Sequence, residues 1–131
     1  MKLSKQERES VRMKFGGRCA YCGDLLGERW HCDHVEPVQR NHRYVLGKGF
    51  VADGTMIWPE RNKLENLFPA CPACNIDKHS FDLEYWRTKL QRACDVLMRN
   101  NSTYRFALRY GLVTETGAKI EFYFERQEPK A

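Results

Sequence analysis

The 131-residue sequence lacks any apolar run close to the roughly twenty residues that a membrane-spanning helix needs. Its first residues include lysines and a serine, and they lack the apolar region of a secretory signal peptide. Internal repeats, low-complexity tracts and linker-like segments are also absent. These absences argue against a membrane, secreted or repeat protein, and they predict a single cytoplasmic domain over residues 1–131.

Four of the six cysteines form two CxxC pairs, Cys19 with Cys22 and Cys71 with Cys74. In a cytoplasmic chain this pattern indicates a metal site rather than disulfides, and a reduced dithiol protein is the alternative. Gly23 allows the tight turn that lets the first two sulfurs reach one ion. Four thiolates fill the coordination shell of zinc, so we predict a structural zinc ion with no open position for substrate.

The excess of positive charge is only moderate. The sequence has 22 Lys and Arg against 17 Asp and Glu, a formal charge of +5. One zinc ion held by four thiolates would lower the formal charge to about +3. Such a surface permits a polyanionic partner, and it is equally compatible with a surface that is merely soluble.

A basic helix is predicted over about residues 5–15. Ser4 and Glu7 fit a capping box at its start, and Gly16 stops it. Its cationic side chains would either contact phosphates or lie in solvent. They are Arg8, Arg12 and Lys14, followed by Arg18.

Asp33 and His34 lie in a predicted short strand that ends near Pro37. Successive side chains of a strand point to opposite faces, so these two cannot both be ligands of one ion from a regular strand. They can flank a reaction centre, where Asp33 binds a hard cation and His34 takes a proton from water. A surface histidine beside a carboxylate is the alternative.

The second CxxC pair is predicted to begin a helix that carries Asn75 and His79 four residues apart on one face. Their amide oxygen and imidazole, with the Asp33 carboxylate, make a hard, incomplete ligand set that leaves room for water and a phosphate oxygen. Alternatively, Asn75 caps the helix and His79 is an ordinary histidine near the helix end, favoured by the helix dipole.

The order and spacing of these elements resemble the four-cysteine, zinc-containing branch of the HNH endonucleases over about residues 11–80. The matching elements are Cys19-x-x-Cys22, Asp33-His34, Glu65-Asn66-Leu67 and Cys71-x-x-Cys74-Asn75-x-x-Lys78-His79. The resemblance implies an α+β class with a treble-clef-like ββα-metal core around the zinc ion. It also implies metal-dependent hydrolysis of DNA phosphodiester bonds.

The resemblance assigns roles to individual residues. His34 would be the general base, Asn66 would brace the loop that orients His34, and Mg²⁺ or Mn²⁺ would be bound by Asp33, Asn75 and His79. One such site cuts one strand, so a double-strand break in the expected double-stranded DNA needs a homodimer or successive nicks by a monomer. The predicted DNA contacts are Lys78, Arg40, Arg43 and Lys48.

Residues 35–65 form a longer connection between His34 and Asn66 than in many members of that family. A connection of this length is usually functional or disordered. It would be either a basic flap against the nucleic acid or a solvated loop pinned by Trp58.

A helical and hairpin extension is predicted over about residues 81–126. One helix is expected over about 83–98 with a buried apolar stripe, and Cys94 is expected to be buried beside it. A shorter helix would run from Asn101 to about Arg109. Alternating apolar residues then predict a strand over 120–125 that pairs with 112–115. The stripe consists of Leu83, Trp86, Leu90, Ala93 and Leu97.

Three classes of function follow from the sequence. The first is a DNA endonuclease from a bacterial or phage-infected cell, since many small relatives of this kind are encoded by phages or mobile elements. The second is a non-catalytic, zinc-stabilised nucleic-acid-binding module. The third is an interaction domain in which zinc is purely architectural. Only the first class requires the hard ligand set of Asp33, Asn75 and His79.

Overall fold

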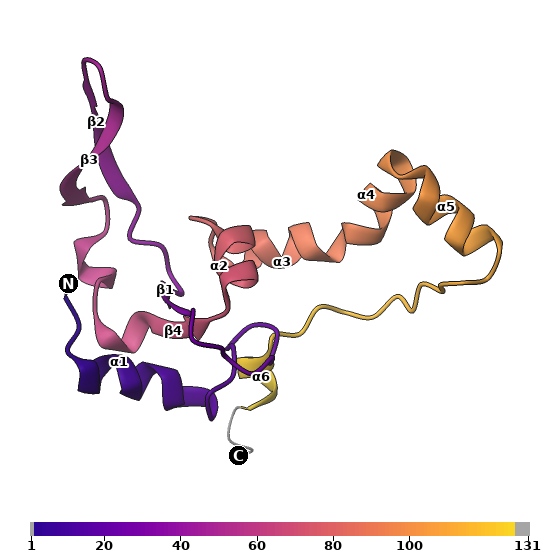
Figure 1. Ribbon diagram of the computed structural model, residues 1–131, viewed down its shortest axis with the longest axis horizontal. Helices are drawn as coiled ribbons and strands as arrows, with labels where there is room; N and C mark the ends of the chain where they lie inside the picture. Colours follow the sequence, from indigo (N-terminus) through magenta and orange to yellow (C-terminus); the bar gives the residue numbers. More distant parts are fainter. Residues whose placement is uncertain (1, 128–131) are drawn as a thin grey trace. The chain divides into compact units, whose positions relative to one another are not determined.

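A computed structural model describes residues 2–127, which form two compact units. The first unit comprises residues 2–83 and 122–127, and the second comprises residues 84–121 (Figure 1). The α+β class is confirmed, because helices accompany two small antiparallel sheets. The expected extension over 81–126 contains the second unit, but its two ends, residues 81–83 and 122–126, belong to the first unit.

The predicted N-terminal helix is confirmed as α1 (Lys5–Arg12), which continues as the 3-10 turn η1 (Met13–Phe15). The capping box is present. The Glu7 backbone N–H donates to Ser4 Oγ at 3.1 Å, and the Ser4 backbone N–H donates to Glu7 Oε1 at 3.0 Å. Gly16 then ends the helical segment in the left-handed region, with φ 65°.

The cationic side chains of this helix bind backbone carbonyls, although Arg8 and Lys14 are also exposed to solvent. Arg8 donates to the Trp30 carbonyl at 2.9 Å, and its guanidinium lies 4.0 Å from the centre of the Trp30 ring. Lys14 donates to the carbonyls of Leu64 and Leu67 at 2.8 and 2.7 Å. Arg12 and Arg18 bind further carbonyls in the same way. These four residues therefore hold α1 and the loop that follows it against the other segments of the first unit.

Two strands and a helix lie at the centre of the first unit. Strand β1 (His31–His34) pairs antiparallel with β4 (Leu67–Ala70), with His31 opposite Ala70 and His34 opposite Leu67. Only one residue, Cys71, separates β4 from helix α2 (Pro72–Lys78). Buried side chains of α1, β4 and the loop before β1 pack around this pair, among them Val11, Trp30 and Leu67.

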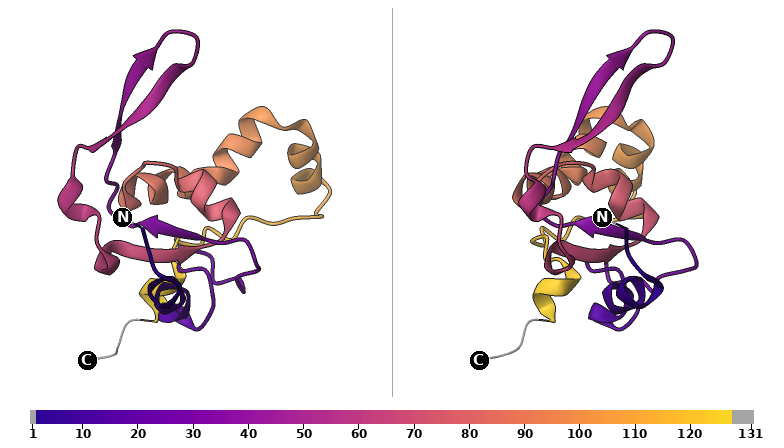
Figure 2. Two further views of the ribbon diagram at one scale, coloured as in Figure 1. Left: turned by 60° about the vertical axis from the view of Figure 1, so that its left-hand side comes forward. Right: turned by 90° about the vertical axis from the view of Figure 1, so that its left-hand side faces the viewer.

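The long connection between β1 and β4 forms a β-ribbon rather than a structureless loop. Strand β2 (Arg40–Val45) pairs antiparallel with β3 (Gly49–Met56), with a bulge between Arg40 and His42. The 3-10 turns η2 (Pro59–Arg61) and η3 (Leu64–Asn66) lead back to β4. The ribbon extends away from the β1–β4 pair in all three views (Figures 1 and 2). Its strands were not predicted, because glycines interrupt the alternation of polar and apolar residues.

The second unit contains most of α3 (Leu83–Gln91), together with α4 (Ala93–Asn100) and α5 (Ser102–Arg109). The single helix expected over 83–98 is broken at Arg92, which lies outside helical geometry at φ −93° and ψ 5°. The shorter helix predicted from Asn101 to about Arg109 is confirmed as α5. The Asn101 side chain caps it by accepting a hydrogen bond from the Tyr104 backbone N–H.

The predicted buried stripe is wrong for its second half. Trp86 is buried, whereas Ala93, Leu97 and Cys94 are exposed. A unit of this size has too few residues to cover both faces of its helices. Helical periodicity identified an apolar face correctly, but it does not determine whether anything packs against that face.

The predicted C-terminal hairpin is also wrong. Residues 112–121 contain no regular secondary structure, and the end of the described chain is a short helix, α6 (Tyr123–Arg126). The backbone N–H groups of Tyr123 and Phe124 donate to the carbonyls of Tyr21 and Ala20. Phe122 is 2 % exposed and packs edge-on against the Tyr21 ring. Burial of these rings in the first unit outweighs the local preference for a strand.

Candidate functional site

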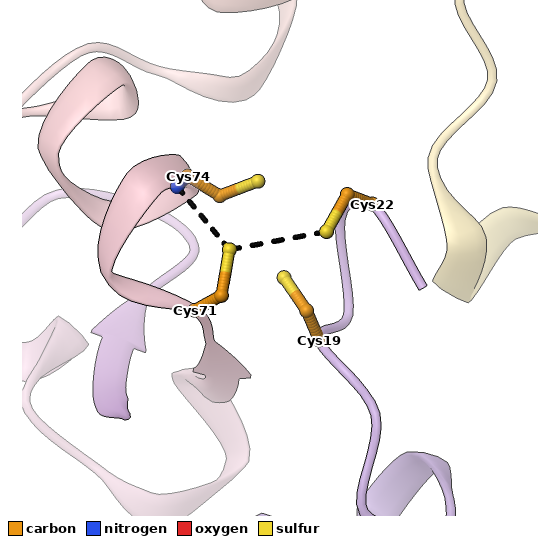
Figure 3. Close-up of side chains that lie close together, drawn as sticks. All are labelled: Cys19, Cys22, Cys71 and Cys74. Atoms are coloured by element: carbon orange, nitrogen blue, oxygen red, sulfur yellow. Dashed lines mark hydrogen bonds between the residues drawn. The ribbon is translucent and has the colours of Figure 1, made fainter. Parts of the chain in front are cut away.

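The four predicted zinc ligands lie together. Cys19 and Cys22 come from the loop after η1, and Cys71 and Cys74 from the start of α2 (Figure 3). Their four sulfur atoms all lie within 4.8 Å of one another. The side chains turn toward a common point, so these residues can hold a metal ion.

The separation of the sulfurs fits zinc. A tetrahedral ion with Zn–S bonds of about 2.3 Å holds its ligands about 3.8 Å apart. The Cys22 and Cys71 sulfurs are 3.8 Å apart. A hydrogen bond from Cys74 lowers the pKa of the Cys19 thiol to about 4, whereas burial raises the pKa of the Cys22 thiol to about 12. Crowded thiols resist carrying several negative charges at once, and a bound divalent cation would offset that repulsion.

Local backbone geometry prepares both halves of this site. Cys71 is the N-cap of α2, and its sulfur accepts from the Cys74 backbone N–H at 3.4 Å. Gly23 has φ 82°, and a Cβ at this position would lie 2.8 Å from the Tyr123 ring. Both the left-handed conformation and the close ring require glycine, which confirms the tight turn predicted after the first pair.

A cavity of about 620 Å³ is lined by residues of β1, of the segment that leads into the ribbon, and of the end of α2. It brings together the four residues to which the sequence assigned the hydrolytic chemistry, Asp33, His34, Asn75 and His79. Arg40 and His42, from the base of the ribbon, line it as well. Side chains from β1, β2 and the end of α2 therefore converge on one space.

Backbone strain is concentrated around this cavity. Among residues 2–127, the non-glycine residues with positive φ are Gln39 and His79, both at φ 51°, and both line the cavity. Such conformations cost free energy and cluster at functional sites. The conformation of His79 also corrects a prediction. Helix α2 ends at Lys78, so His79 does not extend the helical face of Asn75, although both residues reach the same cavity.

His34 is half-buried at the end of β1, and its ring is held by one polar side chain. His34 Nε2 lies 2.9 Å from Asn62 Oδ1, and the His34 backbone carbonyl accepts from Lys78 Nζ at 3.0 Å. The sequence reasoning missed Asn62. Nothing in the local pattern distinguishes it from an ordinary turn residue between Pro59 and Leu64.

Asp33 is buried in an ion pair with Lys78. Their Oδ2 and Nζ atoms are 3.1 Å apart, and the side chains are 9 % and 1 % exposed. The Tyr21 hydroxyl donates to the same Oδ2 at 2.5 Å. Burial and the neighbouring Asp33 charge raise the pKa of Tyr21 well above its ordinary value, so this phenol stays a donor. The prediction that Lys78 contacts DNA is wrong, because its ammonium lies in the protein interior.

Asn66 is 8 % exposed and connects the segments on either side of the ribbon. Its side-chain amide donates to the carbonyls of Glu36 and Arg61, both at 2.8 Å, and its oxygen accepts from the Glu36 N–H at 2.9 Å. Its backbone carbonyl accepts from the Val35 N–H at 2.9 Å. The segment that directly follows His34 is thus held by Asn66 at two consecutive residues.

The other predicted DNA contacts, Arg40, Arg43 and Lys48, are exposed residues of the ribbon. Tyr44 and Phe50 pack edge to face near its tip, with ring centres 5.6 Å apart, and are themselves largely exposed. Trp58, expected to pin the connection, is half-buried under the Arg61 guanidinium at 4.3 Å. The ribbon therefore presents cationic and aromatic side chains to its surroundings.

Comparison of the chain with protein-family models, with characterised proteins and with solved structures found no match. None of the helices in residues 2–127 combines the length and the apolar character that crossing a membrane requires. The described residues define a small α+β protein in which four cysteines are positioned to hold a metal ion.

Proposed function

We propose that this protein is a metal-dependent endonuclease of the HNH type, which hydrolyses DNA phosphodiester bonds on a ββα-metal core. The observation that carries the proposal is the convergence of Asp33, His34, Asn75 and His79 on one cavity. The β1–β4 pair followed by α2, next to the four-cysteine site, is consistent with such a core. Zinc in that site would serve only to hold α2 against the loop that follows η1.

The chain's own residues supply a base and a ligand set. His34 would take the proton of the attacking water, with its ring held by Asn62 and its backbone by Lys78. Asp33 uses Oδ2 for its protein contacts, which leaves Oδ1 to join Asn75 and His79 in binding a hard divalent cation. Magnesium or manganese bound there would stabilise negative charge on the phosphate and on the leaving 3′ oxygen. Arg40, at the same cavity, can bind a phosphate oxygen.

Cleavage of supercoiled plasmid by the wild-type and His34→Ala proteins tests the proposal. Wild type should nick plasmid when Mg²⁺ or Mn²⁺ is added, and His34→Ala should lower the rate at least about 10²-fold, since a general base contributes roughly 10² to 10⁴. His31→Ala is the matched control, because His31 is exposed and does not line the cavity. Zinc content is measured alongside, so that loss of the catalytic cation is distinguished from loss of the structural ion. Equal rates for His34→Ala and wild type would overturn the assignment.

The ribbon is proposed to bind double-stranded DNA, since a two-stranded ribbon fits the major groove. Replacing Arg40, Arg43 and Lys48 together with alanine should weaken DNA binding and reduce the slope of log affinity against log salt by about 2.7, from about 0.9 per phosphate contact. Fluorescence anisotropy with a labelled duplex at several salt concentrations measures both. Alanine at the exposed Lys5, Arg29 and Lys119 removes the same charge elsewhere and should change the slope little.

One observation favours a second candidate, a non-catalytic zinc-stabilised module that binds nucleic acid. Asp33, the only carboxylate that lines the cavity in the described structure, is already paired with Lys78 and hydrogen-bonded by Tyr21. This pairing reduces the negative charge available to a cation. Wild-type protein that binds duplex DNA without nicking it under either metal would favour this candidate, and absence of both activities would favour an interaction domain.

A further inference from the structure

We infer that Asn62 is a positioning residue of the hydrolytic site, which sets the orientation and tautomer of the His34 ring. The inference rests on the proposed function of His34 as general base. Its starting point is the 2.9 Å contact between Asn62 Oδ1 and His34 Nε2. An amide oxygen only accepts hydrogen bonds, so Nε2 must carry the proton in this pair. In a neutral imidazole Nδ1 is then unprotonated, and its lone pair is the one that can remove a proton from water.

The segment that carries Asn62 is fixed relative to the segment that follows His34. Arg61 donates to the Pro37 carbonyl at 3.0 Å and forms an ion pair of 3.6 Å with Glu36. The Asn66 amide binds the Arg61 and Glu36 carbonyls at once. The Asn62 backbone N–H donates to Pro59 at 3.1 Å. The Asn66 amide therefore binds the backbone two residues after His34 and directly before Asn62.

This arrangement divides the work between two asparagines. Asn66, which belongs to the motif, holds the backbone on both sides, and Asn62 alone reaches the ring. A ring that rotates freely would often point Nδ1 away from the attacking water. A ring protonated on Nδ1 would have no lone pair there to take the proton of that water. Loss of the contact should therefore lower the rate of the chemical step without weakening DNA binding.

Two variants of Asn62 distinguish a role in orienting the His34 ring from a role in stabilising the fold. Asn62→Leu keeps a similar shape and removes the acceptor, and Asn62→Asp keeps an acceptor oxygen at the same length. Under single-turnover conditions with saturating duplex and Mg²⁺, Asn62→Leu should cleave about 10- to 100-fold more slowly than wild type. Asn62→Asp should restore most of the rate. Asn100→Leu, at an exposed position at the end of α4, should cleave at the wild-type rate.

The tautomer is read directly, without catalysis, from long-range ¹H–¹⁵N spectra of the zinc-loaded protein. His34 should be protonated at Nε2 and not at Nδ1 in wild type, with its signals assigned by their loss in His34→Gln. Asn62→Leu should populate the other tautomer. Protonation of Nδ1 in wild type, or an Asn62→Leu rate within twofold of wild type, would overturn the inference. If Asn62→Leu does not fold, the wild-type spectrum and the Asn62→Ala rate decide.

Failure of this inference differs from failure of the proposed function. If wild type does not cleave DNA under either metal, the nuclease proposal fails, and with it the catalytic part of the inference. The spectrum still tests the hydrogen bond in that case. If wild type cleaves and His34→Ala does not, an unaffected Asn62→Leu would refute the role of Asn62 alone.

Discussion

Replacing Cys71 with serine, or withdrawing the metal with a strong chelator, should unfold the first unit. Zinc binding to four-ligand sites in small domains contributes about 10–16 kcal/mol at neutral pH, which is at least the total stability of a typical domain, about 5–15 kcal/mol. The first unit buries few large apolar side chains, among them Tyr21, Trp30 and Phe122, and these are too few to replace that contribution. Circular dichroism and thermal unfolding, with metal content from mass spectrometry, should show one zinc ion per folded chain and none in the unfolded variant.

Cysteines outside the site provide the control. Cys94→Ser changes an exposed thiol in the second unit, and Cys32→Ser a half-buried one in β1. Both variants should keep their zinc and lose little stability. Lower pH should release zinc, because the thiolates must then take up protons. A Cys71→Ser variant with the same thermal unfolding midpoint as wild type would show that metal binding by the four cysteines does not stabilise this unit.

Replacing Lys78 with methionine should destabilise the first unit by about 3–5 kcal/mol, the cost of leaving one partner of a buried ion pair alone. Lys78 Nζ is the cation that faces the Asp33 carboxylate, and both side chains are almost inaccessible to water. Methionine fills most of the same volume, so the loss reflects charge and hydrogen bonding rather than a cavity. Urea-induced unfolding with zinc present throughout gives the change in free energy.

The double variant Lys78→Met with Asp33→Asn tests the cause. If an unpaired carboxylate is responsible, removing its charge should recover at least half of the lost stability. Lys119→Met, at an exposed position of the second unit, should change the free energy of unfolding by less than about 0.5 kcal/mol. A single variant as stable as wild type would mean that the pair contributes nothing net to the fold.

The features predicted correctly from the sequence are those that depend on residues close together in the chain. The capping box of α1 joins Ser4 and Glu7, and the left-handed turn at Gly23 was predicted from its place directly after the first CxxC pair. The meeting of the two CxxC pairs is the exception, predicted across a long separation because one tetrahedral ion needs four ligands.

The incorrect predictions share a different cause. Lys78 was expected at the surface because lysine usually is exposed, but Asp33 and the His34 carbonyl, more than forty residues earlier in the sequence, supply its partners. The alternation around Phe122 indicates a strand, but the Tyr21 ring determines where Phe122 packs. Neither outcome can be derived from local propensity, because each depends on a contact between distant segments.

By itself, the sequence determined the α+β class and four cysteines that can hold a metal ion, and it offered an imidazole, an amide and a carboxylate as candidates for a hydrolytic site. Only the tertiary structure decided that these groups share one cavity, that Lys78 is buried against Asp33, and that Asn62 holds the His34 ring. The physical reason is that residue type and spacing limit which chemistry a chain can perform. Which side chains meet is set by how distant segments bury their apolar surface and satisfy their polar groups.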